Sequence, residues 1–167
     1  MLKIYVNTWG NYNENGAEGG EWIRLPDPDL DETLEAIAER IGDTDPEWFI
    51  NDYEWTNRRS FGKIEENSGI FHLNEILEEL ETLDDWDLDK LEAIIEEHTD
   101  NVEIAMEYLD NATFYPGMTL EEVAEQIVDE CYDLPEIALR YFDYEAFARD
   151  LRFDGYTETA HGVICIC

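Results

Sequence analysis

Basic residues are scarce in this chain. Its 167 residues include 10 Lys and Arg against 43 Asp and Glu, which gives a formal net charge of −33 at pH 7. Proteins that bind nucleic acid directly present a basic patch, so the sign of the charge argues against that class of function. A net charge of about 2 to 8 is enough to keep a small domain soluble, and a larger one opposes the compact state through self-repulsion. Solubility alone therefore does not account for this composition.

Cysteines and long apolar runs are also scarce. The three cysteines are odd in number, and Cys165 and Cys167 lie two apart near the end, which does not indicate the disulfide framework of a small secreted domain. No segment has the length of a membrane span, and residues 1–10 lack the apolar run of a signal peptide. We therefore expect a cytoplasmic protein with reduced thiols.

Apolar residues, in contrast, are plentiful enough for a packed interior. Hydrophobic residues make up 44% of the chain and aromatic residues 13%, which excludes a disordered acidic tail. The length suits one ordinary domain or two to three very small ones. The local patterns predict an α+β protein, in the form of an elongated chain of three small units.

The first predicted unit spans residues 1–60 and has the order β-β-α-β. Strands are expected at residues 2–6 and 22–25, with an Asn- and Gly-rich loop between them. A helix follows in which Asp29 and Glu32 have the spacing of a capping box, and it ends at Gly42. A third strand is expected near residues 47–55.

The other two predicted units are an acidic helical unit, residues 61–100, and a C-terminal α+β unit, residues 101–167. In the last unit Thr119 and Glu122 form a second capping-box pattern before a helix whose apolar face includes Cys131. A hairpin is expected to pair residues 156–159 with 163–167.

The final strand pattern is apolar on both faces, so this strand is either central in a sheet or packed against a partner subunit. Units of 40 to 65 residues bury little surface alone. These patterns predict a homodimer that uses the last unit, with dimer contacts at Val163, Ile164 and Ile166.

Acidic residues are spread over the whole chain and are densest in its middle. Residues 1–60, 61–110 and 111–167 carry net charges of −9, −15 and −9. Acid on a helix is usually a solvated face, but like charges three or four residues apart cost roughly 0.2–0.5 kcal/mol per pair. Glu75, Glu78, Glu79 and Glu81 have no Lys or Arg nearby to pair with. The predicted partner-binding surface consists of Glu75, Glu78, Glu79, Glu81, Asp84, Asp85, Asp87, Asp89, Glu92, Glu96, Glu97, Asp100, Glu103 and Glu107.

This charge density is similar to that of duplex DNA. B-DNA carries one charge per roughly 1.7 Å of axis, so the net charge of −33 corresponds to about 56 Å, or roughly 16 base pairs. An acidic surface of this density suits the basic groove of a DNA-binding enzyme. The composition therefore predicts a DNA mimic, not a DNA-binding protein.

Several segments of the chain, in the same order along its length, resemble the ArdA antirestriction family. The segments are LKIYV at 2–6, NYN at 11–13, EWI at 21–23, DYE at 52–54, an acid-rich stretch at 91–108, LP at 134–135 and YFDYEAFARDL at 141–151. The resemblance implies an elongated, three-domain, dimeric DNA mimic carried by mobile genetic elements such as conjugative transposons. It also implies inhibition of type I restriction–modification enzymes through the DNA groove of their methyltransferase core.

A calcium-binding protein is the alternative. Asp85, Asp87, Asp89 and Glu96 have the spacing of EF-hand positions 1, 3, 5 and 12, although Lys90 stands where the loop requires Gly.

Two further arrangements are weaker candidates. Cys131 with His161 could form a nucleophile and base, and Cys165 with Cys167 could bind a soft metal. His72 and His98 are expected at the surface or at caps. We therefore expect no catalytic residue, no metal site and no cofactor.

Overall fold

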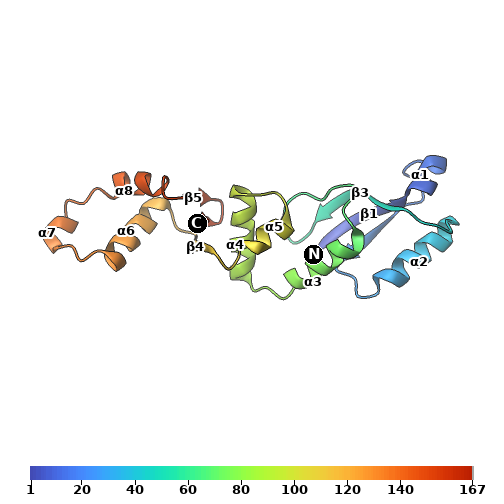
Figure 1. Cartoon of the computed structure of the whole chain (residues 1–167), viewed down its shortest axis with the longest axis horizontal. Helices are drawn as coiled ribbons and strands as arrows, with labels where there is room; N and C mark the ends of the chain where they lie inside the picture. Colours follow the sequence, from blue (N-terminus) through green and yellow to red (C-terminus); the bar gives the residue numbers. More distant parts are fainter. Residues whose placement is uncertain (167) are drawn as a thin grey trace. The chain divides into compact units, whose positions relative to one another are not determined.

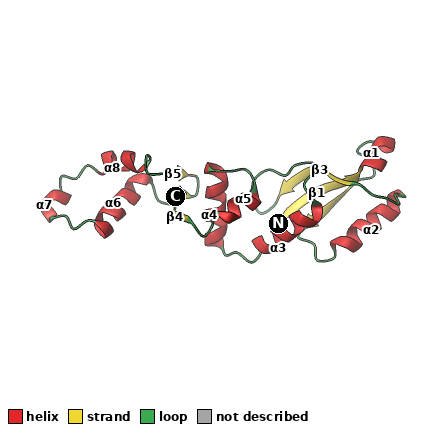
Figure 2. Cartoon of the chain, viewed as in Figure 1, coloured by secondary structure: helices red, strands yellow, loops and turns green. Residues whose placement is uncertain are grey.

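The computed structural model describes residues 1–166, which form two compact units, one from Met1 to Leu83 and one that begins at Asp84. We call them unit 1 and unit 2. The described residues contain eight helices and two three-stranded antiparallel sheets, so the predicted α+β class is confirmed (Figures 1 and 2). The predicted boundaries at residues 60 and 100 stay predictions.

The sheet of unit 1 is built around its first strand. Strand β1 (Leu2–Thr8) lies between β2 (Glu21–Leu25) and β3 (Trp48–Trp55) and is antiparallel to both. Leu2, Ile4 and Val6 alternate along β1 and are fully buried, as a strand with one covered face requires. The three predicted strands of this unit are therefore confirmed.

A short helix replaces part of the predicted loop after β1, so the loop prediction is wrong there. Helix α1 (Trp9–Asn15) begins because the hydroxyl of Thr8 accepts a hydrogen bond from the backbone N–H of Asn11. It ends at Gly16, whose φ of 67° suits a residue without a Cβ. The Asn- and Gly-rich composition indicated a loop, but capping at both ends favours one helical segment.

Helix α2 (Leu30–Ile41) buries Leu30, Leu34, Ile37 and Ala38, and it ends at Gly42 in the left-handed conformation. The predicted capping box is wrong, since the side chain of Asp29 makes no capping hydrogen bond. The carboxylate of Asp27, two residues earlier, instead accepts hydrogen bonds from the Asp29 N–H at 3.0 Å and from the Thr33 hydroxyl at 2.8 Å. Helix α3 (Ile70–Leu80) completes unit 1.

Unit 2 contains a sheet in the order β4-β6-β5, formed by β4 (Ala112–Pro116), β5 (Tyr156–Thr159) and β6 (Gly162–Ile166). The predicted hairpin is confirmed, although Cys167 lies outside the described residues. Strand β6 is central, which accounts for its two apolar faces within one protomer.

Helices cover both sides of this second sheet. Helix α4 (Asp85–Glu97) and the short α5 (Val102–Glu107) lie on one side, and α6 (Leu120–Cys131) and α8 (Tyr144–Leu151) lie on the other (Figure 1). The connection between α6 and α8 contains α7 (Glu136–Leu139). The core beneath α6 and α8 contains Leu120, Val123, Ala124, Ala148, Leu151 and Val163. The capping box of Thr119 and Glu122 is present, as predicted.

Candidate functional site

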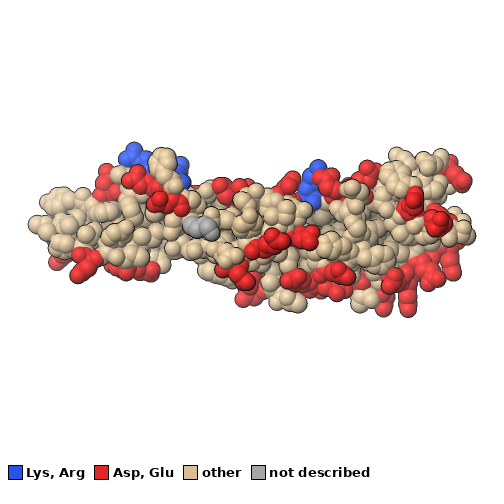
Figure 3. Space-filling view, in the orientation of Figure 1, with Lys and Arg blue, Asp and Glu red and all other residues tan. Residues whose placement is uncertain are grey.

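Both units are strongly acidic. Unit 1 holds 20 acidic and 6 basic residues and unit 2 holds 23 and 4, so their formal charges are −14 and −19. Acidic side chains are correspondingly far more frequent than basic ones on the face drawn in Figure 3. The candidate site is therefore a surface property of each unit.

The acidic residues of α3 lie opposite its buried face. Glu75, Glu78 and Glu79 are exposed, while Leu73 and Leu77 on the other side are buried. Glu81, the C-cap residue, is also exposed. This arrangement follows from the 3.6-residue period, which separates the two sets by about half a turn.

The first turn of α4 holds acids that stabilise the helix itself. The carboxylate of Asp84 accepts a hydrogen bond from the Asp87 N–H at 2.9 Å, which makes Asp84 the N-cap. Asp85 and Asp87 follow in the first turn, where the helix dipole favours negative charge. Asp84 and Asp85 are exposed and Asp87 is half-buried.

The later acids of α4 lie against the β5–β6 hairpin. The carboxylate of Glu96 accepts from the Ala160 N–H at 3.0 Å, and that of Glu97 accepts from the Thr157 hydroxyl at 3.1 Å. Asp89 is half-buried and Glu92 is only 9% exposed. Of these four, Glu96 and Glu97 still present exposed side chains, whereas Glu92 is an interior residue.

The remaining predicted residues surround α5. Asn101 is its N-cap and accepts from the Ile104 N–H at 3.1 Å, while Val102 and Ala105 are buried. Asp100, Glu103 and Glu107 are all exposed. Eleven of the fourteen predicted residues are thus exposed, two are half-buried and one is buried.

A single basic residue stands between Lys63 and Arg140, and it is Lys90. Its side chain is half-buried, and its ammonium group donates to the backbone carbonyl of Leu109. This cation therefore serves the packing of α4 within unit 2. The stretch it interrupts contains 24 acidic residues, which include every residue of the predicted surface.

Large apolar side chains are exposed among these carboxylates. Phe71 on α3 is 49% exposed, Trp86 on α4 is 49% exposed, and Ile104 on α5 is 43% exposed. The Trp86 ring also packs edge-on against Phe114, with centroids 5.5 Å apart. The acidic surface of each unit therefore includes apolar contact points, and charge patterns alone did not indicate them.

The structure also tests the predictions for the calcium loop, the cysteines and the histidines. The EF-hand spacing is wrong as a calcium loop, because residues 85–97 form the continuous helix α4. The prediction that Cys131 belongs to the apolar face of α6 is wrong, because the buried face of that helix ends at Val128 and Cys131 is exposed. Cys165 is a buried thiol, and Cys167 lies outside the described residues. His72 and His98 are exposed, and His98 is the C-cap of α4.

The predicted dimer residues lie on the central strand of unit 2. Val163 and Ile164 are fully buried within the protomer, and Ile166 is half-buried. Large apolar side chains are exposed elsewhere in the unit, at Tyr132, Ile137, Tyr141 and Phe153. Dimerisation through the β6 residues stays a prediction.

The comparison with protein families shows to which family the chain belongs. The family model described as Antirestriction protein (ArdA) matches residues 4–165. The chain belongs to the ArdA family. The resemblance predicted from sequence segments is therefore confirmed over nearly the full length. No curated protein matches the chain.

Membership in the ArdA family establishes the coarse function, which is antirestriction, and it implies restriction–modification enzymes as the target. ArdA proteins are inhibitors, not known enzymes, which agrees with a candidate site made of surface carboxylates. Among residues 1–166, no helix of this ArdA chain combines the length and the apolar composition that crossing a lipid bilayer requires.

Proposed function

We propose that this ArdA protein is a DNA mimic that inhibits type I restriction–modification enzymes in the cytoplasm. In this proposal its exposed carboxylates occupy the DNA-binding groove of the methyltransferase core. The observation that carries the proposal is the stretch between Lys63 and Arg140, which contains 24 acidic residues and one basic residue whose ammonium group is bound to a carbonyl.

The proposed mimic competes with DNA for a basic groove. A groove that binds duplex DNA contains Lys and Arg side chains, and much of its affinity comes from the counterions that their contacts with phosphate release. Exposed carboxylates on α3, α4 and α5 present the same sign of charge to that groove. The surface we propose consists of the thirteen predicted residues other than the buried Glu92.

The exposed apolar residues supply a second kind of contact. Phe71, Trp86 and Ile104 lie on the same three helices as the proposed acidic surface. Aromatic residues are enriched among those that dominate binding energy at protein interfaces, and their contribution does not depend on salt. We infer that they let the enzyme bind this protein when salt has weakened binding to DNA.

The proposed homodimer uses the last part of unit 2. Ile137 lies in α7 and is 70% exposed, and Tyr141, four residues further along the chain, is 81% exposed. Large exposed apolar side chains grouped in one segment are typical of interaction sites. Sedimentation of the wild-type protein and of an Ile137→Asp, Tyr141→Ser variant tests this step, and a wild-type monomer at micromolar concentration would contradict it.

The function itself is tested by titrating a purified type I restriction–modification enzyme with the protein. DNA binding and DNA cleavage are measured in parallel at several DNA concentrations. We expect stoichiometric inhibition that added duplex DNA relieves. Inhibition at far below one protein per enzyme, or inhibition that excess DNA does not relieve, would contradict the mimic and indicate another antirestriction mechanism.

A further inference from the structure

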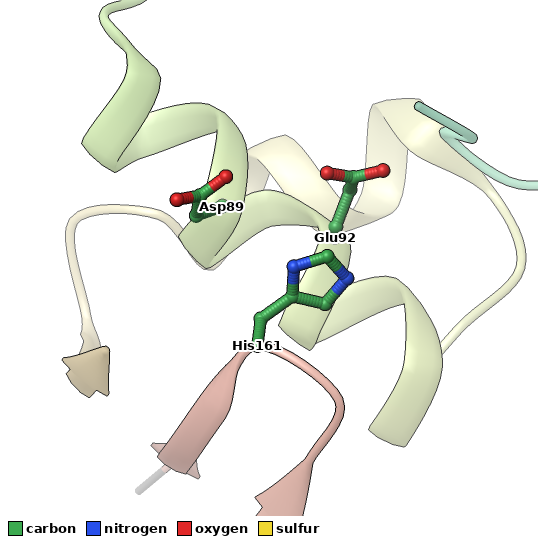
Figure 4. A group of neighbouring side chains, drawn as sticks. All are labelled: Asp89, Glu92 and His161. Carbon is green, nitrogen blue, oxygen red and sulfur yellow. The ribbon is translucent and has the colours of Figure 1, made fainter. Parts of the chain in front are cut away.

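Three potential metal ligands meet inside unit 2. Asp89 and Glu92 are three residues apart and therefore share one face of α4, and His161 lies in the turn between β5 and β6. One ligand atom of each residue lies within 4.8 Å of those of the other two. Figure 4 shows the two carboxylates and the imidazole around one common space.

The turn that carries His161 is held in place by hydrogen bonds on both sides. The His161 N–H donates to the Thr159 hydroxyl at 3.2 Å, and the His161 carbonyl accepts from the Gly117 N–H at 2.8 Å. One residue earlier, the Ala160 N–H donates to Glu96 on α4. The backbone of His161 is therefore positioned against α4 independently of its side chain, as a preorganised ligand requires.

Burial distinguishes Glu92 from the other carboxylates among residues 1–166. Glu92 is only 9% exposed, and Asp89 and His161 are half-buried. Removing a carboxylate from water is costly, and coordination to a metal ion is one of the arrangements that offset this cost. Two carboxylates and a neutral imidazole carry a charge of −2, which a divalent cation neutralises.

We propose that Asp89, Glu92 and His161 bind one divalent transition-metal ion per chain, for which Zn²⁺ is the probe. One imidazole and two carboxylates form a borderline donor set that suits Zn²⁺, whereas Mg²⁺ and Ca²⁺ prefer oxygen ligands alone. At Zn–ligand distances of about 2.0–2.2 Å, tetrahedral ligand atoms lie about 3.4 Å apart. In the proposed site, small side-chain rotations bring the ligand atoms from separations of up to 4.8 Å to this closer spacing. A water molecule takes the fourth position around the ion.

The bound ion joins α4 to the β5–β6 hairpin. Because the three ligands come together only in the folded unit, binding stabilises the folded state by mass action. This role is largely separate from the acidic surface, since of the three ligands only the half-buried Asp89 also belongs to the proposed mimic surface.

The experiment is a calorimetric titration of the chelator-treated full-length protein with Zn²⁺, with Mg²⁺ at the same ionic strength as a control for diffuse binding. We expect one saturable Zn²⁺ site per chain and a raised melting temperature. His161→Ala and Glu92→Gln should each weaken this site at least about tenfold. Circular dichroism without metal shows whether each variant remains folded.

A matched control is available on α3. His72 is exposed, and its Nδ1 lies 3.8 Å from a carboxylate oxygen of Glu75, so His72→Ala removes an imidazole beside an acid outside the cluster. That variant should bind Zn²⁺ like the wild type. Equal affinity in the wild type and His161→Ala, or many ions per chain with no dependence on His161, would overturn the proposal.

Two spectroscopic measurements use the wild-type protein, so their outcome does not depend on whether the variants fold. Zn²⁺ should shift the imidazole NMR signals of His161 and leave those of His72 and His98 in place. Substituting Co²⁺ should give weak visible bands without a thiolate charge-transfer band. A strong near-ultraviolet thiolate band, or unshifted His161 signals at saturation, would assign the ion to the cysteines or to the general surface instead.

Discussion

The backbone N–H of Ala160 donates a hydrogen bond to the carboxylate of Glu96 at 3.0 Å, which connects the β5–β6 turn to α4. Glu96 has the sequence pattern of a surface acid, and its side chain is indeed exposed. It also accepts a hydrogen bond that holds a turn in place. Glu96 therefore contributes both a surface charge and a structural hydrogen bond, and different substitutions can remove one without the other.

The first prediction uses this pair. Glu96→Gln removes the charge but keeps an oxygen that accepts from Ala160, so stability should stay nearly unchanged. Glu96→Ala removes the acceptor and should lower the free energy of unfolding by about 1 kcal/mol or less, because the bond is exposed. Urea denaturation of both variants measures the difference. Equal losses in the two variants would show that the charge, not the hydrogen bond, stabilises the turn.

The second prediction concerns the acidic surface as a whole. Changing Glu75, Glu78, Glu79 and Glu81 to Gln removes four exposed charges from unit 1. Inhibition of the restriction enzyme should weaken progressively as the four changes accumulate, while one change has little effect. The charge-matched control changes four exposed acids of α6 to their amides, namely Glu121, Glu125, Asp129 and Glu130. If the control weakens inhibition equally, net charge rather than the proposed surface is responsible.

The third prediction separates the two kinds of contact. Binding to the restriction enzyme should weaken as salt rises, since counterion release contributes less. Trp86→Ala should weaken binding by about tenfold at every salt concentration and leave the slope against log salt unchanged, because it removes apolar contact without charge. Binding constants at four salt concentrations test this. A changed slope for the Trp86 variant would argue against an apolar contribution.

The fourth prediction concerns the capping box of α6. The Thr119 hydroxyl accepts from the Glu122 N–H at 3.3 Å, and Thr119→Ala should lower the free energy of unfolding by about 1 kcal/mol. Hydrogen bonds from the Thr119 N–H and then its hydroxyl lower the pKa of Glu122. A depressed folded pKa adds stability above the unfolded pKa, and this stability is lost as pH falls through the folded value.

Glu122→Gln should therefore reduce stability at neutral pH but not at a pH below the folded pKa of Glu122. Denaturation curves recorded at both pH values, for the wild type and for this variant, measure the effect. A loss of equal size at both pH values would show that the charge of Glu122 has no part in the box.

The fifth prediction tests the turn that carries His161. Gly162 has a φ of 137°, and a Cβ there would lie 2.2 Å from the Tyr115 carbonyl oxygen. Gly162→Ala should therefore destabilise unit 2 by more than 1 kcal/mol or so. Gly16→Ala is the control, since that site also has positive φ but no atom within 4 Å. Thermal melting measures the stability of both variants. Equal losses of stability would show that the positive φ alone, and not the clash with the Tyr115 carbonyl, destabilises the Gly162 variant.

Local patterns predicted most of the helices and strands, and their failures have local causes. The capping box at Thr119 is present, while the same spacing at Asp29 does not form one, and there Asp27 accepts from the Asp29 N–H, which is the donor that Glu32 would bind in such a box. The loop before Gly16 contains a helix, because Thr8 caps it and the buried Asn11 donates to Asn7 at 2.8 Å. Competing side-chain acceptors a few residues apart are not distinguished by spacing alone.

The sequence by itself determined the excess of acid, the alternation of apolar and polar residues that sets the helices and strands, and the ArdA resemblance. These properties depend on composition and on neighbours within a few positions. Only the tertiary structure placed β6 in the middle of its sheet, buried Glu92, and brought His161 to α4 across some seventy residues of chain. Such contacts arise from the pairing of distant strands and helices, which a local pattern does not encode.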